Sequence, residues 1–100
     1  IAAIEIGPLF VTATSGERIT LATSGGFLEV LGNVVTVLAE TVEPASDIDL
    51  DRARAAEGRA LKRLAESPAG FDRHRAELAL ERARNRTRVA MGQVGTKRDL

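Results

Sequence analysis

The chain has 100 residues, no cysteine and a formal net charge of zero, and its only aromatic residues are three Phe. A chain of this length can form one domain, or a small domain with an appendage. The lack of cysteine excludes disulfides and thiolate metal sites. No apolar run in it approaches the ~20 residues that a membrane-spanning helix needs. Any core must therefore be built mainly from Val, Ile, Leu and Ala.

The balanced charge hides two halves of opposite sign. Residues 1–50 contain one cation and seven acids, a balance of −6, whereas residues 51–100 contain 13 cations and seven acids, a balance of +6. Such asymmetry indicates that the second half meets an anionic ligand, an acidic protein surface or a nucleic acid. Composition does not choose among these three.

The first 40 residues predict short strands and tight turns, because β-branched runs alternate with Gly, Ser and Asn. Gly32-Asn33 is a two-residue connection typical of a tight hairpin, whereas Ser24-Gly25-Gly26 is interpreted as a turn, since neither a Lys-Ser/Thr pair nor a helix follows it as in a phosphate-binding loop. Four short strands bury little apolar area, so we expect further strands before Ile1. The strands are expected at 10–14, 18–22, 26–31 and 34–39.

After Pro44 the apolar period changes from two to about 3.6, which predicts two helices, at about 49–66 and 72–91. Ser46 and Asp49 can form a capping box, with Asp47 as a rival cap, and Asp72 can cap the second helix. The break at 67–70 contains Pro and Gly and is short, so the helices should be antiparallel neighbours. Their shared face is mostly Ala and buries little area, so this hairpin should be able to open. The expected stripes are Leu50, Ala53, Ala56, Ala60, Leu61 and Leu64, then Ala76, Ala79, Leu80, Ala83 and Ala90.

Two segments resemble the epsilon subunit of bacterial F-type ATP synthases. The run TSGGFLEVLGNVVTVLAE at 23–40 resembles the family's motif at the end of its β-sandwich, and Ile48-Asp49-Leu50-Asp51-Arg52-Ala53 resembles the element that opens its helical hairpin. The resemblance implies an α+β fold, a partial antiparallel β-sandwich followed by a two-helix hairpin. Residues 1–44 would be the C-terminal part of the sandwich, 45–91 the hairpin and 92–100 a flexible tail.

The resemblance also implies a function. The chain would belong to the central rotor stalk, couple proton flow to ATP synthesis and inhibit ATP hydrolysis when the hairpin extends into the catalytic hexamer. Its partners would be the gamma subunit, the ring of membrane c subunits and acidic segments of the catalytic beta subunits, which would meet the basic second helix. It would lie peripherally at the cytoplasmic face of the bacterial plasma membrane, neither inserted in the membrane nor catalytic itself.

Several bacterial members of this family bind ATP as a regulatory ligand in the folded hairpin, so the resemblance implies ATP as a regulatory ligand of this chain and no required cofactor. Guanidinium groups suit a polyphosphate through bidentate hydrogen bonds, although Arg on a helix can equally be a solvated side chain. The matching positions are Glu43, Asp49, Arg52, Ala53, Arg59, Arg82 and Arg86. No metal site and no catalytic residues are predicted, and the single His74 is expected to be exposed.

The alternative is a basic helical hairpin that binds nucleic acid. Two observations oppose it: the helices carry no aromatic residue for base stacking apart from Phe71, and acids interrupt the basic residues. An enzyme is the weakest hypothesis, because no nucleophile, base and orienting group stand together. We therefore expect no nucleic-acid partner.

Overall fold

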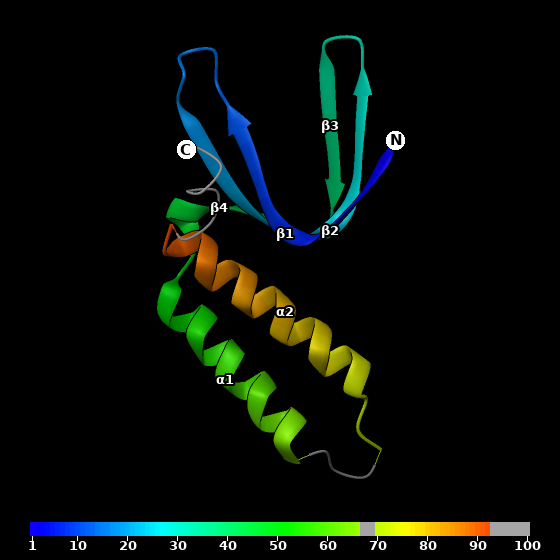
Figure 1. Ribbon diagram of the computed structural model, residues 1–100, viewed down its shortest axis with the longest axis vertical. Coiled ribbons are helices and arrows are strands. Elements are labelled where there is room, and N and C mark those ends of the chain that lie inside the picture. Colours follow the sequence, from blue (N-terminus) through cyan, green and yellow to red (C-terminus); the bar gives the residue numbers. More distant parts are fainter. Residues whose placement is uncertain (67–69, 93–100) are drawn as a thin grey trace, which may run out of the picture.

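The computed structural model describes residues 1–66 and 70–92 of the chain. An antiparallel sheet is followed by two antiparallel helices, which confirms the predicted fold class (Figure 1). The break at 67–69 and most of the expected tail, 93–100, lie outside the described residues. The elements are β1 (Ala2–Thr12), β2 (Arg18–Leu31), β3 (Val34–Ala39), β4 (Val42–Pro44), the 3₁₀ helix η1 (Ala45–Asp47), α1 (Leu50–Glu66) and α2 (Arg73–Ala90).

β2 is the central strand of one sheet that bends into two arms. β1 pairs along one edge of β2, whereas β3 and β4 pair in one common register along the other edge, β3 with residues 26–31 and β4 with residues 21–23. The two arms rise from the bend as a V (Figure 1). The strand predicted at 34–39 is confirmed as β3, whereas the other three were predicted too short, because β1 has 11 residues and β2, which includes both 18–22 and 26–31, has 14.

The interpretation of Ser24-Gly25-Gly26 as a turn was also wrong, since these residues form the bend inside β2. Gly26 has φ +150°, and a Cβ built on it would overlap the backbone oxygen of Leu38 and lie 2.8 Å from Ala39 Cα. Only glycine lets the strands approach this closely while the chain bends. The Gly32-Asn33 hairpin is confirmed, with Gly32 at φ +58° and Leu31 paired to Val34.

The two helices pack through a seam of alanines. The predicted stripes are confirmed for four buried alanines, but Leu61 is 43% exposed and two further buried residues, Asn85 and Val89, were not predicted to face the core. Small side chains let the helix axes approach closely and bury little apolar area, so the seam itself is weakly held. The four alanines are Ala53, Ala60, Ala76 and Ala83.

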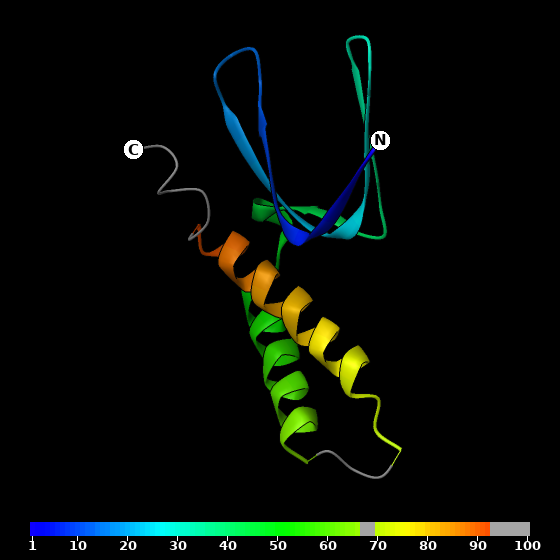
Figure 2. The ribbon, with the colours of Figure 1, turned by 45° about the vertical axis from the view of Figure 1, so that its right-hand side comes forward.

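α2 lies directly beneath the bend of the sheet, and α1 lies beyond it (Figures 1 and 2). A small core joins the layers, in which Ala22 of β2 meets Ile48, Ala53 of α1 and Val89 of α2. We call this arrangement the docked hairpin. No helix among the described residues is long and apolar enough to cross a membrane.

The structure identifies Asp49 as the cap of α1, because its Oδ1 accepts the Arg52 N–H at 3.1 Å. Asp72 caps α2 in the same way, as predicted. The predicted capping box with Ser46 as the cap was wrong, because Ser46 and its rival Asp47 both lie in η1 and Asp49 is itself the cap.

We expect Asp49→Ala to lower the free energy of unfolding by ~1 kcal/mol, the usual loss for a helix N-cap. Asp47→Ala should change it by less than ~0.5 kcal/mol, as for most surface substitutions. Urea denaturation of the two variants measures both values. A larger loss for the Asp47 variant would contradict the assignment of the cap.

Candidate nucleotide site

The candidate site is a cleft of ≈ 700 Å³ bounded by the sheet, α1 and α2. Three of the seven predicted site residues line it: Glu43, Arg82 and Arg86. Its volume falls in the usual range for small-molecule sites. The remaining lining residues are Ala22, Thr23, Ser24, Glu40, Thr41, Val42, Ala56, Ala79 and Ala83.

The two arginines reach the cleft from the same face of α2, since they stand four residues apart. Both are half-buried, in contrast to Arg84 and Arg88 on the same helix, which are exposed. Arg82 and Arg86 are thus partly removed from water, whereas the other two arginines remain solvated. Partial burial strengthens their interaction with an anion, because less water screens the charge.

Arg86 is held in place by Glu43 of β4. Its Nε lies 2.7 Å from Glu43 Oε1, and its Nη2 donates to Glu43 Oε2 at 3.1 Å. This side-on pairing uses the Nε–Nη2 edge of the guanidinium and leaves the Nη1–Nη2 edge for a second anion. Glu43 is therefore suited to orient Arg86 rather than to contact an anionic ligand.

The four predicted residues of α1 and its cap do not line the cleft. Asp49 caps the helix, Ala53 is fully buried in the core, and Arg52 and Arg59 are exposed. Arg52 and Arg59 of α1 therefore do not line the cleft with Arg82 and Arg86 of α2 in this conformation. Both exposed arginines nevertheless share a helix face with Ala56, which lines the cleft, because they lie four and three residues from it.

The sequence did not identify the polar residues at the bend as part of the cleft. Ser24 Oγ accepts the Thr41 N–H at 2.9 Å, and Ser24 N–H donates to Thr41 O at 3.2 Å. Both residues line the cleft beside Glu40. Glu40 and Thr41 line the cleft because they lie in the break between β3 and β4. No residue pattern around Glu40 predicts this break.

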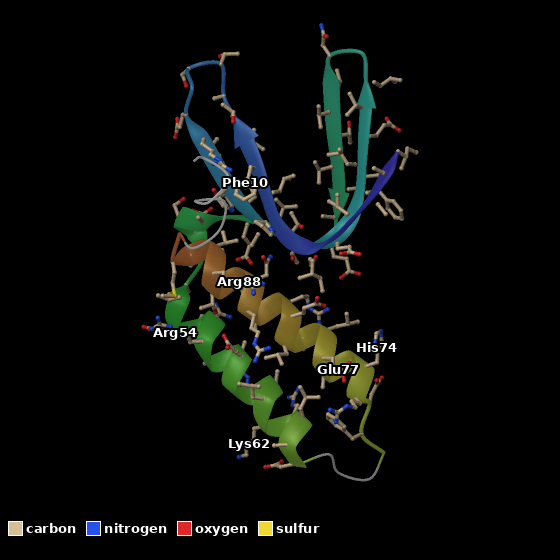
Figure 3. The ribbon with its side chains drawn as sticks, viewed as in Figure 1. Phe10, Arg54, Lys62, His74, Glu77 and Arg88 are labelled. Atoms are coloured by element: carbon tan, nitrogen blue, oxygen red, sulfur yellow. The ribbon has the colours of Figure 1, made fainter. Side chains whose placement is uncertain are left out.

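The chemistry of the cleft suits the binding of an anion. Small apolar walls are combined with two arginines, one of which is already oriented by a carboxylate. In the part of the chain that the structure describes, no three His, Cys, Asp or Glu side chains gather to hold a metal ion. His74 is exposed as predicted and, like Lys62, extends away from the helices (Figure 3).

Two family models cover the chain almost end to end. Residues 1–45 match the beta-sandwich domain of the ATP synthase Delta/Epsilon chain, and residues 46–91 match its long alpha-helix domain. Neither model describes a nucleic-acid-binding module. The two matches meet between β4 and α1, where the sheet gives way to the helices.

Individual relatives agree with these matches. The ATP synthase epsilon chain of Salinibacter ruber is 56% identical over 105 residues, which cover 97% of this chain and 70% of the relative. That of Desulfitobacterium hafniense is 52% identical over 90 residues, 90% of this chain and 67% of the relative. That of Nitratidesulfovibrio vulgaris is 49% identical over 89 residues, 89% of this chain and 66% of the relative. The chain therefore belongs to the epsilon chain family and is a subunit of ATP synthase.

Proposed function

We propose that this subunit is non-catalytic and regulatory, and that the cleft binds ATP as a regulatory ligand. The observation that carries the proposal is that the sheet, α1 and α2 all contribute to the cleft. A ligand in it contacts all three only while the hairpin is docked. ATP is then bound by the docked form and not by the extended form.

The residues of the cleft match the two ends of ATP. The half-buried Arg82 and Arg86 supply guanidinium groups for phosphate oxygens, and Glu43 fixes the orientation of the second. Small side chains such as Ala56 and Ala79 supply an apolar surface for a flat base. The flexible side chains of Arg52 and Arg59, on the face of Ala56, are long enough to turn toward the phosphates. We keep all seven positions in the proposed site on this basis, with Asp49 and Ala53 as structural members.

Binding to one conformation makes ATP a regulator. A ligand that binds only the docked form shifts the docked-to-extended equilibrium by its differential affinity. The weak alanine seam keeps the two forms close in free energy, so a ligand of modest affinity is sufficient. High ATP thus favours the docked form, and low ATP favours release of the hairpin.

The proposal extends to partners and location. We assign the sheet to the gamma subunit and the ring of membrane c subunits, at the cytoplasmic face of the bacterial plasma membrane. The released hairpin would reach acidic segments of the catalytic beta subunits and inhibit ATP hydrolysis. The exposed cations of α2 support this assignment, because long-range attraction guides a basic helix to an acidic surface.

Reversing the exposed charges of α2 tests the inhibitory role. Replacing the exposed Arg73, Arg75 and Arg88 together with Glu should relieve inhibition of ATP hydrolysis several-fold, since attraction to an acidic partner becomes repulsion. None of the three lines the cleft. The measurement is the hydrolysis rate of the reconstituted complex, from a subunit shown beforehand to inhibit.

The matched control changes the same number of charges on α1. Arg54, Lys62 and Arg63 are exposed, and replacing them with Glu should relieve inhibition less. Equal relief from both triple variants would mean that net charge matters and that α2 has no specific contact. Unchanged inhibition by the α2 variant would refute the contact itself.

A further inference from the structure

Asn85 is a buried polar residue that the proposed nucleotide site does not use. It lies in the interior of α2, where Asn is a poor helix former, and its exposed fraction is 1%. It does not line the cleft. A buried amide needs a reason to be there, because leaving water costs free energy unless hydrogen bonds replace it.

The amide connects α2 to two strands at once. Asn85 Nδ2 donates to the backbone oxygen of Gly7 on β1 at 2.9 Å and to that of Thr23 on β2 at 3.4 Å. Gly7 and Thr23 face each other in the β1–β2 register, next to the bend. One side chain therefore reaches across a strand pair.

The bonding pattern fixes the orientation of the amide. Both partners are carbonyl oxygens, so the nitrogen must face them, because the opposite orientation would set oxygen against two acceptors. Oδ1 then points away and has no hydrogen-bond partner among the described residues. The site is thus built around donation from α2 to the sheet.

The remaining contacts of α2 with the sheet are weakly specific. Among the described residues, Asn85 is the one α2 side chain that donates to backbone oxygens of the strands, and the Arg86–Glu43 pair is half-exposed. Around it the helix presents mostly alanine, such as Ala83. Small apolar side chains can slide by a turn with little loss, whereas a hydrogen-bonded amide fixes one position.

We infer that Asn85 is a latch, a residue that holds the hairpin docked in one register through its two hydrogen bonds to the bent sheet. When the hairpin extends, water replaces both bonds, so the latch can open. When it closes, the amide must return to one strand pair. The inference rests on the docked conformation and does not depend on ATP binding.

Thiol labelling of a cysteine introduced by Val89→Cys measures docking directly. Val89 is 1% exposed in the core between the helices and the sheet, it does not line the cleft, and the 100 residues contain no native cysteine. A labelling reagent reaches a thiol at this position only when the hairpin leaves, so the rate reports the open fraction. The assay uses the complete subunit carrying this substitution, without ATP.

Asn85→Leu keeps the number and branching of the side-chain heavy atoms and removes the donors, and we expect labelling to accelerate about tenfold or more, the effect of a lost buried hydrogen bond on an equilibrium. Asn85→Asp keeps the shape and sets a carboxylate against two carbonyls, so its acceleration should be larger. Arg88→Ala, three residues away and exposed, should label as the parent does. A Leu variant that labels as slowly as the parent would overturn the latch.

Hydrogen exchange in the β2–β3 arm separates release from global unfolding. The amides of Phe27–Leu31 pair with β3 in this arm, beyond the bend. If the latch holds only the hairpin, their protection stays at the parent level while labelling of the introduced thiol accelerates. If protection of the arm falls in parallel with labelling, Asn85 stabilises the whole fold and the latch is refuted.

Discussion

ATP affinity should fall at least about a hundredfold when Arg82 and Arg86 are both replaced by Ala. A charge-assisted hydrogen bond contributes ~1.5–3 kcal/mol, and two lost bonds reach this loss even at the lower limit. Both side chains line the cleft and are half-buried, so water compensates their removal only in part. Isothermal titration calorimetry of the complete subunit measures the affinity.

The matched control is the double variant Arg84→Ala, Arg88→Ala. It removes the same charge from the same helix, but both side chains are exposed and neither lines the cleft. It should bind ATP within about threefold of the parent, since exposed charges are screened. If both double variants bind alike, attraction to ATP is diffuse and the cleft is not its site.

Single variants then define the outer part of the site. Arg52→Ala should weaken binding about tenfold if that side chain turns toward the phosphates, and Arg54→Ala should not. If Arg52→Ala binds ATP as tightly as the parent, the phosphate-binding residues are restricted to the sheet and α2. The binding proposal would survive this result, because it rests on Arg82 and Arg86.

Gly26→Ala should lower the free energy of unfolding by at least ~3 kcal/mol, the upper range for backbone strain and overpacking. The added Cβ would overlap Leu38 O, and that oxygen is part of the backbone of β3, so it cannot rotate away. The strands must separate or the bend must straighten. Urea denaturation measures the loss.

Gly58→Ala is the same chemical change with the opposite expected sign. Gly58 lies in the interior of α1, where a Cβ meets nothing within 4 Å. Alanine should stabilise the helix there by ~0.5–1 kcal/mol, because glycine loses more backbone freedom on folding. If Gly26→Ala changes the free energy of unfolding no more than Gly58→Ala does, the bend does not depend on Gly26.

The sequence predicted the helices better than the strands for a physical reason. Helix limits depend on local chemistry, such as the caps Asp49 and Asp72, and the observed helices begin one residue after each. The length of β2 depends on its neighbours, because β1 pairs with Ser24 and Gly26 and β3 pairs with Gly26, although glycine ordinarily interrupts a strand. The local sequence pattern contains the glycines but does not show which strands will pair with them.

The candidate site divides in the same way. The four-residue spacing of Arg82 and Arg86 predicted their common face, and both line the cleft. The positions of Arg52 and Arg59 relative to that cleft depend on how α1 rotates against α2, which the alanine seam determines and no spacing within one helix reveals. Asn85 carried one signal, a poor helix former in a helix interior, but its partners are 62 and 78 residues away.

β1 and β2 both continue through the bend as one paired ladder, which makes this strand pair the mechanical link of the subunit. The arm that carries β3 and the part of the sheet that meets α2 share β2 without any intervening loop. A force on the β2–β3 arm is therefore transmitted to the helices through covalent and hydrogen-bonded backbone. Its direction changes at the glycines of the bend. The stiffness of that corner, set by Gly26 against Leu38, determines how faithfully a displacement at one end of the sheet is reproduced at the other.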